Sequence, residues 1–199
     1  ILPPDSHDSF RLFLQIMDKL TDHFLIATPA LEDSFFSGSV VYLCRHDEDG
    51  ALGVVINKPS PIPMEAVFSA ADTPVPERFK NRPILVGGPV QINRGFVVHC
   101  PAGEWSSSFS VGGENAVTTS RDIIDKLGDS GAVEKAIVTI GCSNWESGQL
   151  ENELAQNVWI AVPADGSILF DLPLNRRYRA ALSKLGIEPA SLVKGAGHA

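Results

Sequence analysis

Short apolar runs rich in β-branched residues recur along this chain, and each is closed by a turn-forming residue. Residues 24–28 end at Pro29, and residues 135–140 end at Gly141. Runs of about five residues bounded by proline or glycine are typical of β-strands. The same pattern predicts further strands at 39–44, 52–56, 84–86, 96–100, 107–111 and 158–162. Strands therefore outnumber helices, and we expect the chain to fold around a sheet.

The connections between these runs indicate how the strands pair. Residues 39–44 and 52–56 flank a charged loop that ends at Gly50, which predicts an antiparallel hairpin. Pro59 and Pro61 should end the preceding strand, because proline cannot donate to a β-ladder. Helices are expected within 1–19, at 64–71, from a Ser120 cap to about 127, around Leu150 and Leu154, and from an Asn175 cap to Gly186. This pattern predicts a mixed α+β fold.

Composition and charge limit the class of protein, its partners and its cellular compartment. The 199 residues are 44% apolar and 20% charged, which is typical of a globular protein. A net charge of −8 argues against direct DNA binding and against anionic membranes. Cys44, Cys100 and Cys142 lie in or beside apolar runs, as reduced thiols do in a reducing compartment. Since no apolar run approaches ~18 residues and no signal peptide is evident, we expect a cytoplasmic protein with no membrane contact.

One segment is more specific than any other part of the chain. Gly87-Gly88-Pro89 closes one apolar run, and Arg94-Gly95 opens the next, which ends at His99. Together with other short motifs, this segment resembles the YqgE/AlgH family of bacterial proteins. The motifs that carry the resemblance lie at 24–29, 39–42, 53–57, 87–99, 145–151 and 197–199.

This resemblance runs from about Leu20 to Ala199 and implies a single domain over 1–199. The implied fold is α+β, with a mixed, mostly antiparallel split sheet curled into a pseudo-barrel with flanking helices. The family is linked to transcriptional regulation of exopolysaccharide synthesis in some bacteria, while its biochemistry is unsettled. The chain departs from relatives at 141–145, which read Gly-Cys-Ser-Asn-Trp instead of Gly-Tyr-Ala-Gly-Trp, and at Tyr178, where relatives often have tryptophan.

A candidate ligand pocket is predicted near the start of the helix that contains Leu150. Trp145 would supply an apolar wall, and Gln149 and Glu151 would supply polar ends. The alternative is that Trp145 anchors the helix while the other two side chains are solvated. Three more residues are candidates for the same pocket by their polarity and their positions at strand ends: His99, Arg94 and Asn57.

Metal and cofactor sites are not indicated. His46, His99 and the cysteines have the chemistry of zinc ligands, but no Cys-x-x-Cys or His-x-x-x-His spacing occurs, so we expect no metal. Cys142 follows a predicted strand and precedes a helix, where its pKa could be lowered for nucleophilic attack. A packed, inert thiol is the preferred interpretation. We therefore assign no catalytic residue and no cofactor.

Two further motifs have structural alternatives. Gly87 and Gly88 could cradle an anion, but a strand rather than a helix follows and Pro89 lacks an N–H, which favours a tight structural turn. Three arginines, Arg176, Arg177 and Arg179, cluster near the start of a predicted helix, where cations oppose the helix dipole. Acidic neighbours are the simplest explanation for this cluster.

Three functional hypotheses follow. The preferred one is a cytoplasmic, non-enzymatic binding or regulatory protein that acts through a small-molecule ligand or a protein partner. The alternative is a small-molecule enzyme, a hydrolase or transferase, that uses a pocket near Trp145, His99 and Cys142. A third hypothesis, direct DNA binding, lacks a basic face and a helix-turn-helix signature.

Overall fold

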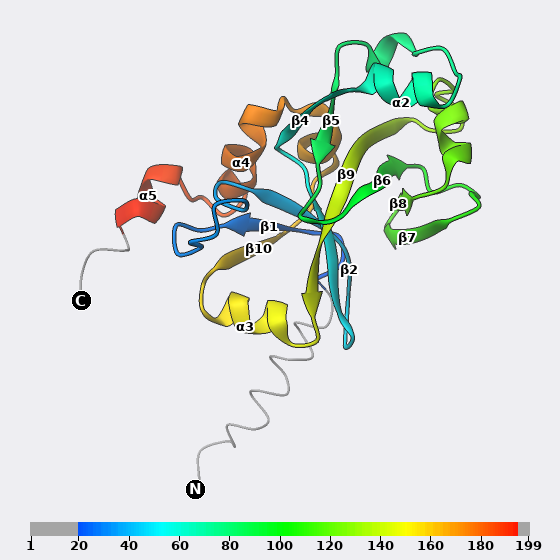
Figure 1. The fold of residues 1–199 in the computed structure, drawn as a ribbon. Coiled ribbons are helices and arrows are strands. Elements are labelled where there is room, and N and C mark those ends of the chain that lie inside the picture. Colours follow the sequence, from blue (N-terminus) through cyan, green and yellow to red (C-terminus); the bar gives the residue numbers. More distant parts are fainter. Residues whose placement is uncertain (1–19, 195–199) are drawn as a thin grey trace, which may run out of the picture.

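The computed structural model describes residues 20–194 (Figure 1). The helix expected within 1–19 and the closing motif at 197–199 lie outside the described residues. The strands are β1 His23–Ala27, β2 Val40–Asp47, β3 Gly50–Val55, β4 Pro59–Pro63, β5 Pro83–Val86, β6 Val90–Cys100, β7 Ser108–Gly112, β8 Asn115–Thr118, β9 Lys135–Glu146 and β10 Trp159–Pro163. The α-helices are α2 Met64–Ala70, α3 Gln149–Ala155, α4 Leu174–Ser183 and α5 Pro189–Lys194. Shorter helical segments are η1 Glu77–Phe79, η2 Arg121–Lys126 and the π-helical turn η3 Ser167–Asp171.

The sheet is mostly antiparallel and curls into a half-barrel flanked by helices, which confirms the expected fold class. The strand order is β10-β1-β2-β3-β9-β6-β8-β7, and β4 and β5 branch from it. β5 runs parallel to β9, while the other pairs are antiparallel. Figure 1 shows β9 crossing the centre of the molecule, with α2 near its beginning and α3 at its end. Its first half pairs with β6 and its second half with β3, so a single strand joins both parts of the split sheet.

The Gly87-Gly88 motif lies where the chain crosses β9. A Cβ at Gly87 would overlap the carbonyl oxygen of Gly141, and a Cβ at Gly88 would overlap that of Cys142. The Gly87 N–H donates to the Ile140 carbonyl at 2.8 Å, so this amide is already engaged. Gly141 has a φ of 75°, which glycine adopts without steric cost. The motif is therefore a close backbone crossing, in agreement with the structural interpretation.

Side chains on both faces of the sheet are buried. Along β2, successive side chains pack alternately into a cluster on one face and a cluster on the other. Val40, Tyr42 and Cys44 pack into one cluster with residues of α4 and η3. Val41 and Leu43 point to the opposite face and pack into a second cluster, which includes Leu150 of α3. Successive strand side chains alternate between faces, so an all-apolar strand needs cover on both sides. A third cluster lies under α2, η1 and η2.

Most strand predictions are confirmed, and the 39–56 hairpin pairs antiparallel as expected, with Asp47 opposite Gly50. β3 ends at Val55, before the prolines, as predicted. The segment Pro59–Pro63 then forms a short strand, β4, that the sequence did not predict; it pairs with β5 only, and at such an edge a missing N–H leaves no ladder bond unmade. One strand prediction was wrong at its end. β9 does not end at Gly141 but continues to Glu146, because this glycine absorbs the local bend.

The helix ends also differ from expectation. α4 begins at Leu174 behind Pro173, so Asn175 lies in the first turn and is not the cap. The segment after Ser120 is a 3-10 helix, and the Ser120 hydroxyl donates to Asp122 at 2.5 Å instead of capping it. β8 and α5 had no sequence signal strong enough to predict them. β8 is only four residues long, so little periodicity was available to find it.

Candidate functional site

Trp145 anchors helix α3 to the sheet. It is 6% exposed and packs in the cluster that contains Leu150. Its indole N–H donates to Glu153 Oε2 at 2.9 Å, and the indole N–H of Trp159 donates to the same oxygen at 2.8 Å. The two rings meet edge to face with centroids 5.9 Å apart. These contacts fit the alternative stated for Trp145, in which the side chain anchors the helix and does not line a ligand pocket.

Gln149 and Glu151 form hydrogen bonds with other residues of the same chain. The Gln149 amide donates to Glu153 Oε1 at 2.9 Å and accepts the Glu146 N–H at 3.0 Å. Glu151 Oε1 lies 2.9 Å from Nε2 of the buried His46. Trp145 and Gln149 also border an open, polar depression beside the β2–β3 hairpin. For Trp145, Gln149 and Glu151, a ligand-binding role stays a prediction.

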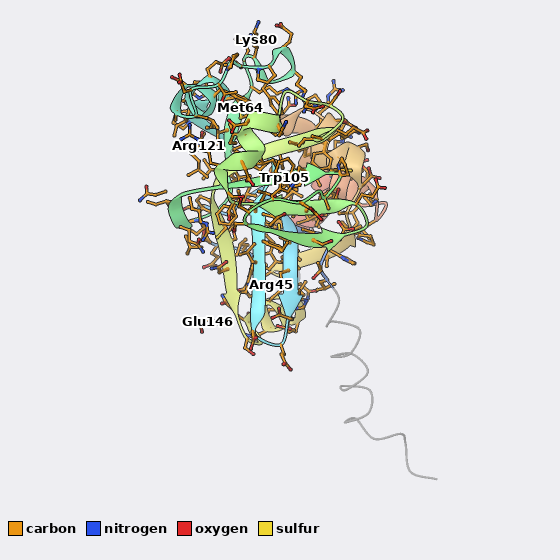
Figure 2. All side chains as sticks on the ribbon, turned by 90° about the vertical axis from the view of Figure 1, so that its right-hand side faces the viewer. Arg45, Met64, Lys80, Trp105, Arg121 and Glu146 are labelled. Atoms are coloured by element: carbon orange, nitrogen blue, oxygen red, sulfur yellow. The ribbon has the colours of Figure 1, made fainter. Side chains whose placement is uncertain are left out.

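His99 lies far from Trp145. Opposite Ala136 in the β6–β9 register, it is separated from Trp145 by roughly 30 Å of strand at about 3.3 Å per residue. Figure 2 shows this separation through the labelled residues next to them: Trp105, whose ring centroid is 5.9 Å from that of His99, and Glu146, at the lower end of β9. The six candidate residues therefore do not share one pocket.

The His99 imidazole is buried and fully engaged. Nδ1 lies 2.9 Å from the Pro101 carbonyl, which can only accept, so this nitrogen carries the proton. Nε2 lies 2.8 Å from the Thr118 hydroxyl, which also lies 2.9 Å from the Ser108 hydroxyl. Burial lowers the pKa of His99, which keeps the ring neutral.

Arg94 and Asn57 are also engaged by other residues: Arg94 lies 3.4 Å from Gln91, which borders the same depression as Trp145, and Asn57 lies beyond the end of β3. The exposed Arg94 donates to Thr119 Oγ1 at 2.9 Å and lies over the Phe96 ring. Asn57 accepts the Val40 N–H at 2.9 Å and donates to the Gly38 carbonyl at 2.8 Å. Asn57 thus closes the loop before β2.

The thiol and metal alternatives find little support in the geometry. Cys142 lies inside β9 rather than at a helix N-terminus, and burial raises the pKa of its thiol. Within the described range 20–194, no group of three or more His, Cys, Asp or Glu side chains is arranged to hold a metal ion.

A different cavity has the features of a ligand site. It lies between the α2–β5 region and the η3–α4 region, and its volume is about 270 Å³. Small-molecule sites typically begin near roughly 300 Å³, so a small ligand would fill it. Its apolar walls are Met64, Phe79, Leu85, Phe170 and Leu174. Its charged lining residues are Arg82, Asp171 and Arg177.

Arg177 is the unusual member of this lining. The side chain is 4% exposed, and its guanidinium donates from Nε to the Leu172 carbonyl at 3.0 Å and from Nη1 to the Ile56 carbonyl at 2.7 Å. Burial and, after it, the charge of Arg82 lower the pKa of Arg177 to about 10. Across residues 20–194 no carboxylate lies within 4.0 Å of Arg177 or of Arg82. The cavity therefore contains two guanidinium groups without a direct ion-pair partner.

The neighbouring arginines show what a paired or structural role looks like. Arg179 forms the expected acidic pair, with Glu188 at 2.9 Å. Arg78 donates to the carbonyls of Leu127, Val133 and Glu134 and so holds the loop after η2. For Arg177 the acidic neighbour is Asp171, which lines the same cavity but makes no direct ion pair with it; main-chain carbonyls take its N–H groups.

Helical spacing could have identified Arg177 as the inward-facing arginine. It lies three residues after Leu174 and four before Ala181, which places all three on one face of α4. That face is buried against the sheet. No sequence signal pointed to Arg82, which lies in the loop before β5.

Comparisons with known proteins agree with the geometry of the fold. A model of the family described as AlgH-like (DUF179) matches residues 24–190. A UPF0301 protein of Neisseria meningitidis serogroup B is 57% identical over 180 residues, 90% of this chain and 99% of that protein. A UPF0301 protein of Dechloromonas aromatica is 46% identical over 90% of this chain and 97% of its own length.

Two solved structures also match. The solution structure of the AlgH protein from Pseudomonas aeruginosa has a TM-score of 0.73 and 42% identity, covering 90% of this chain and 96% of that one. The crystal structure of a Corynebacterium diphtheriae protein has a TM-score of 0.68 at 19% identity, covering 82% of this chain and 85% of that one, and is evidence for the fold alone.

Proposed function

This chain belongs to the AlgH-like family, and from that premise we propose that it is a non-enzymatic binding protein whose ligand occupies the cavity beside Arg177. The bound ligand would modulate a contact with a protein partner, which is how a regulatory role could operate without direct DNA binding. The net charge of −8 supports the absence of DNA readout.

The observation that carries this proposal is the buried guanidinium of Arg177 at the wall of a cavity. A buried charge is costly unless it is paired and hydrogen-bonded. Two carbonyls satisfy part of Arg177, but the positive charge of Arg82 opposes it more than the negative charge of Asp171 favours it. A ligand in the cavity would offset this cost. The transfer of the ligand's apolar surface from water to the apolar walls would also favour binding.

The test is a fragment screen by ¹⁵N–¹H NMR on the full chain. We expect hits to shift the amide signals of residues that line the cavity, such as Leu85, Val138 and Leu174. Leu174→Trp should fill the cavity and abolish these shifts, while Leu185→Trp, at an exposed position outside the lining, should preserve them. Shifts centred on Trp145, or hits that survive Leu174→Trp, would contradict the proposal.

The alternative is an enzyme that uses Cys142, and thiol reactivity separates the two hypotheses. Because burial raises the pKa of Cys142, its thiolate should be scarce at pH 7.5. We expect iodoacetamide to label the half-buried Cys100 first and Cys142 only slowly, at a rate below that of a free cysteine. Mass spectrometry of the labelled peptides measures both rates. Labelling of Cys142 faster than a free thiol would favour the enzyme.

We place the protein in the cytoplasm. Three free cysteines, Cys44, Cys100 and Cys142, support a reducing compartment. Over residues 20–194, no helix is both long enough and apolar enough to cross a bilayer.

A further inference from the structure

We propose that the ligand of this cavity is a small monoanionic acid, with a carboxylate head held between Arg82 and Arg177 and an apolar body against the cavity walls. The inference rests on the proposed function and adds the chemical class of the ligand to it.

The first step is the N–H inventory of Arg177. A guanidinium has five N–H groups in a planar fork. Nε and Nη1 each donate to a main-chain carbonyl, those of Leu172 and Ile56. Nη2 has no acceptor in the described part of the chain, yet it is not among the polar atoms sealed from solvent. Since Arg177 lines the cavity, Nη2 is available to an acceptor within it.

The second step is Arg82, whose exposed guanidinium forms no side-chain hydrogen bond in the part of the chain that the structure describes. A free planar fork binds a carboxylate through two parallel N–H···O bonds. Arg82 comes from the loop before β5 and Arg177 from α4, so two separate elements bring these arginines to one cavity. A carboxylate between them would relieve the repulsion between two like charges.

The third step concerns the net charge of a ligand that the cavity can accept. Its lining carries two positive side chains, Arg82 and Arg177, and one negative side chain, Asp171. Asp171 also pairs with Lys135 at 2.7 Å, so it is held in place rather than free to move to an arginine. Counted over the lining side chains alone, one positive charge is in surplus, which matches a monoanion; Lys135 lies outside the lining, and the Asp171 carboxylate that it pairs with would repel a second negative charge on the ligand.

The last step is the apolar body. Met64, Phe79, Leu85, Phe170 and Leu174 surround the space, and its volume of about 270 Å³ suits a ring or a short chain. Met64 is labelled in the upper half of the molecule in Figure 2, on the α2 side of this cavity. A bare inorganic anion would leave these walls without a partner.

The experiment compares four probes by isothermal titration with the full chain at low salt: phenylacetate, its neutral isostere phenylacetamide, acetate and phenyl phosphate. A hydrogen bond to a charged group contributes a factor of roughly 10 to 100 in affinity, so phenylacetate should bind that much more tightly than phenylacetamide. Acetate should bind more weakly than phenylacetate because it lacks the apolar body.

The outcomes separate this inference from the proposed function. If phenylacetamide binds in the cavity as tightly as phenylacetate, the acid is not required, and only the ligand class is wrong. If phenyl phosphate binds more tightly than phenylacetate, the site prefers a dianion, and again only the class is wrong. If no probe or fragment shifts the cavity amides, both proposals fail.

Matched arginine variants test the head group. Arg82→Gln removes an exposed charge and should weaken phenylacetate about tenfold or more while leaving phenylacetamide unchanged. Arg176→Gln removes the same charge from an exposed position outside the lining and should change neither. Arg177→Lys keeps the charge but loses the fork, and it should weaken phenylacetate provided that its folding is confirmed by circular dichroism. If the ratio of the phenylacetate affinity to the phenylacetamide affinity is the same in wild type and in Arg82→Gln, the inference is overturned.

Discussion

At the scale of single residues, main-chain carbonyls stabilise the polar side chains that enter the interior. Arg78 donates to carbonyls after η2, Arg177 to those of Leu172 and Ile56, and His99 to that of Pro101. A buried polar group needs such partners, because an unsatisfied one loses its hydration without compensation. Arg177 differs from Arg78 in being almost fully buried, and from His99 in carrying a positive charge at the wall of a cavity, which makes it a candidate for ligand binding.

Gly88 should not tolerate a side chain. An added Cβ would overlap the carbonyl oxygen of Cys142, and that oxygen belongs to the backbone of β9 and cannot turn aside. We expect Gly88→Ala to cost at least about 3 kcal/mol of unfolding free energy, the upper end of overpacking effects. Gly166→Ala is the control, since nothing lies within 4 Å of its Cβ position and its φ of −61° suits alanine. Urea denaturation measures both; equal midpoints would contradict the crossing argument.

His99 should make stability depend on pH. Burial lowers the pKa of the folded His99 below the ordinary value of about 6.5, so at a pH between the two values the unfolded chain binds more protons. Stability should therefore be full above pH 6.5 and fall as the pH drops below it. Urea midpoints of wild type and His99→Asn between pH 5 and 7.5 measure the effect. The stability difference should shrink toward low pH, and a constant difference would assign the pH dependence to other groups.

At the scale of elements, one carboxylate fastens α3 to two strands. Glu153 accepts the indole N–H groups of Trp145 on β9 and Trp159 on β10, and the amide of Gln149 on its own helix. α3 has only seven residues, which is too short to be stable by itself. Packing against the sheet must therefore hold the helix in place.

Removing the Trp145 ring should loosen this junction. We expect Trp145→Ala to cost about 3–5 kcal/mol of unfolding free energy, the usual range for a buried aromatic side chain. Trp145→Phe keeps most of the ring but loses the N–H, so it should cost about 1–2 kcal/mol. Denaturant midpoints measure both. A small loss in Trp145→Ala, accompanied by a loss of binding, would instead support the pocket prediction.

At the scale of the whole molecule, β9 makes the two parts of the sheet interdependent. It pairs with β3 on one side of the bend at Gly141 and with β5 and β6 on the other. Melting either part would leave half of this strand without its ladder. The single domain predicted over 1–199 should therefore unfold as one cooperative unit.

Native-state hydrogen exchange tests this cooperativity. The slowest amides of β1–β2, such as Leu25 and Val41, should open with the same free energy as those of β6–β8, such as Val98 and Val117, because all four residues are buried in paired strands. A difference of more than about 1 kcal/mol between the two groups would show independent opening and would argue for two domains. Exchange near α5 serves as the internal control for local fraying.

Local patterns determined much of the fold from the sequence alone. β-branched runs closed by glycine or proline identified most strands, and the Gly50 loop identified the β2–β3 hairpin, because turns and strand propensity act over a few residues. The resemblance carried by 87–99 supplied the split, curled sheet. Strand pairing at the edges of the sheet could not be predicted in this way, because no local sequence feature distinguishes a proline-rich loop from the edge strand β4.

Only the tertiary structure decided which side chains meet. His99 and Trp145 are both associated with β9, but the strand's length keeps them at opposite ends. Arg82 and Arg177 are remote in sequence, yet both line one cavity. A cavity is the space left when elements from distant parts of the chain pack together, so its existence depends on the fit between surfaces that no single segment contains. For that reason the sequence predicted the framework of this protein, and the structure was needed to find its candidate site.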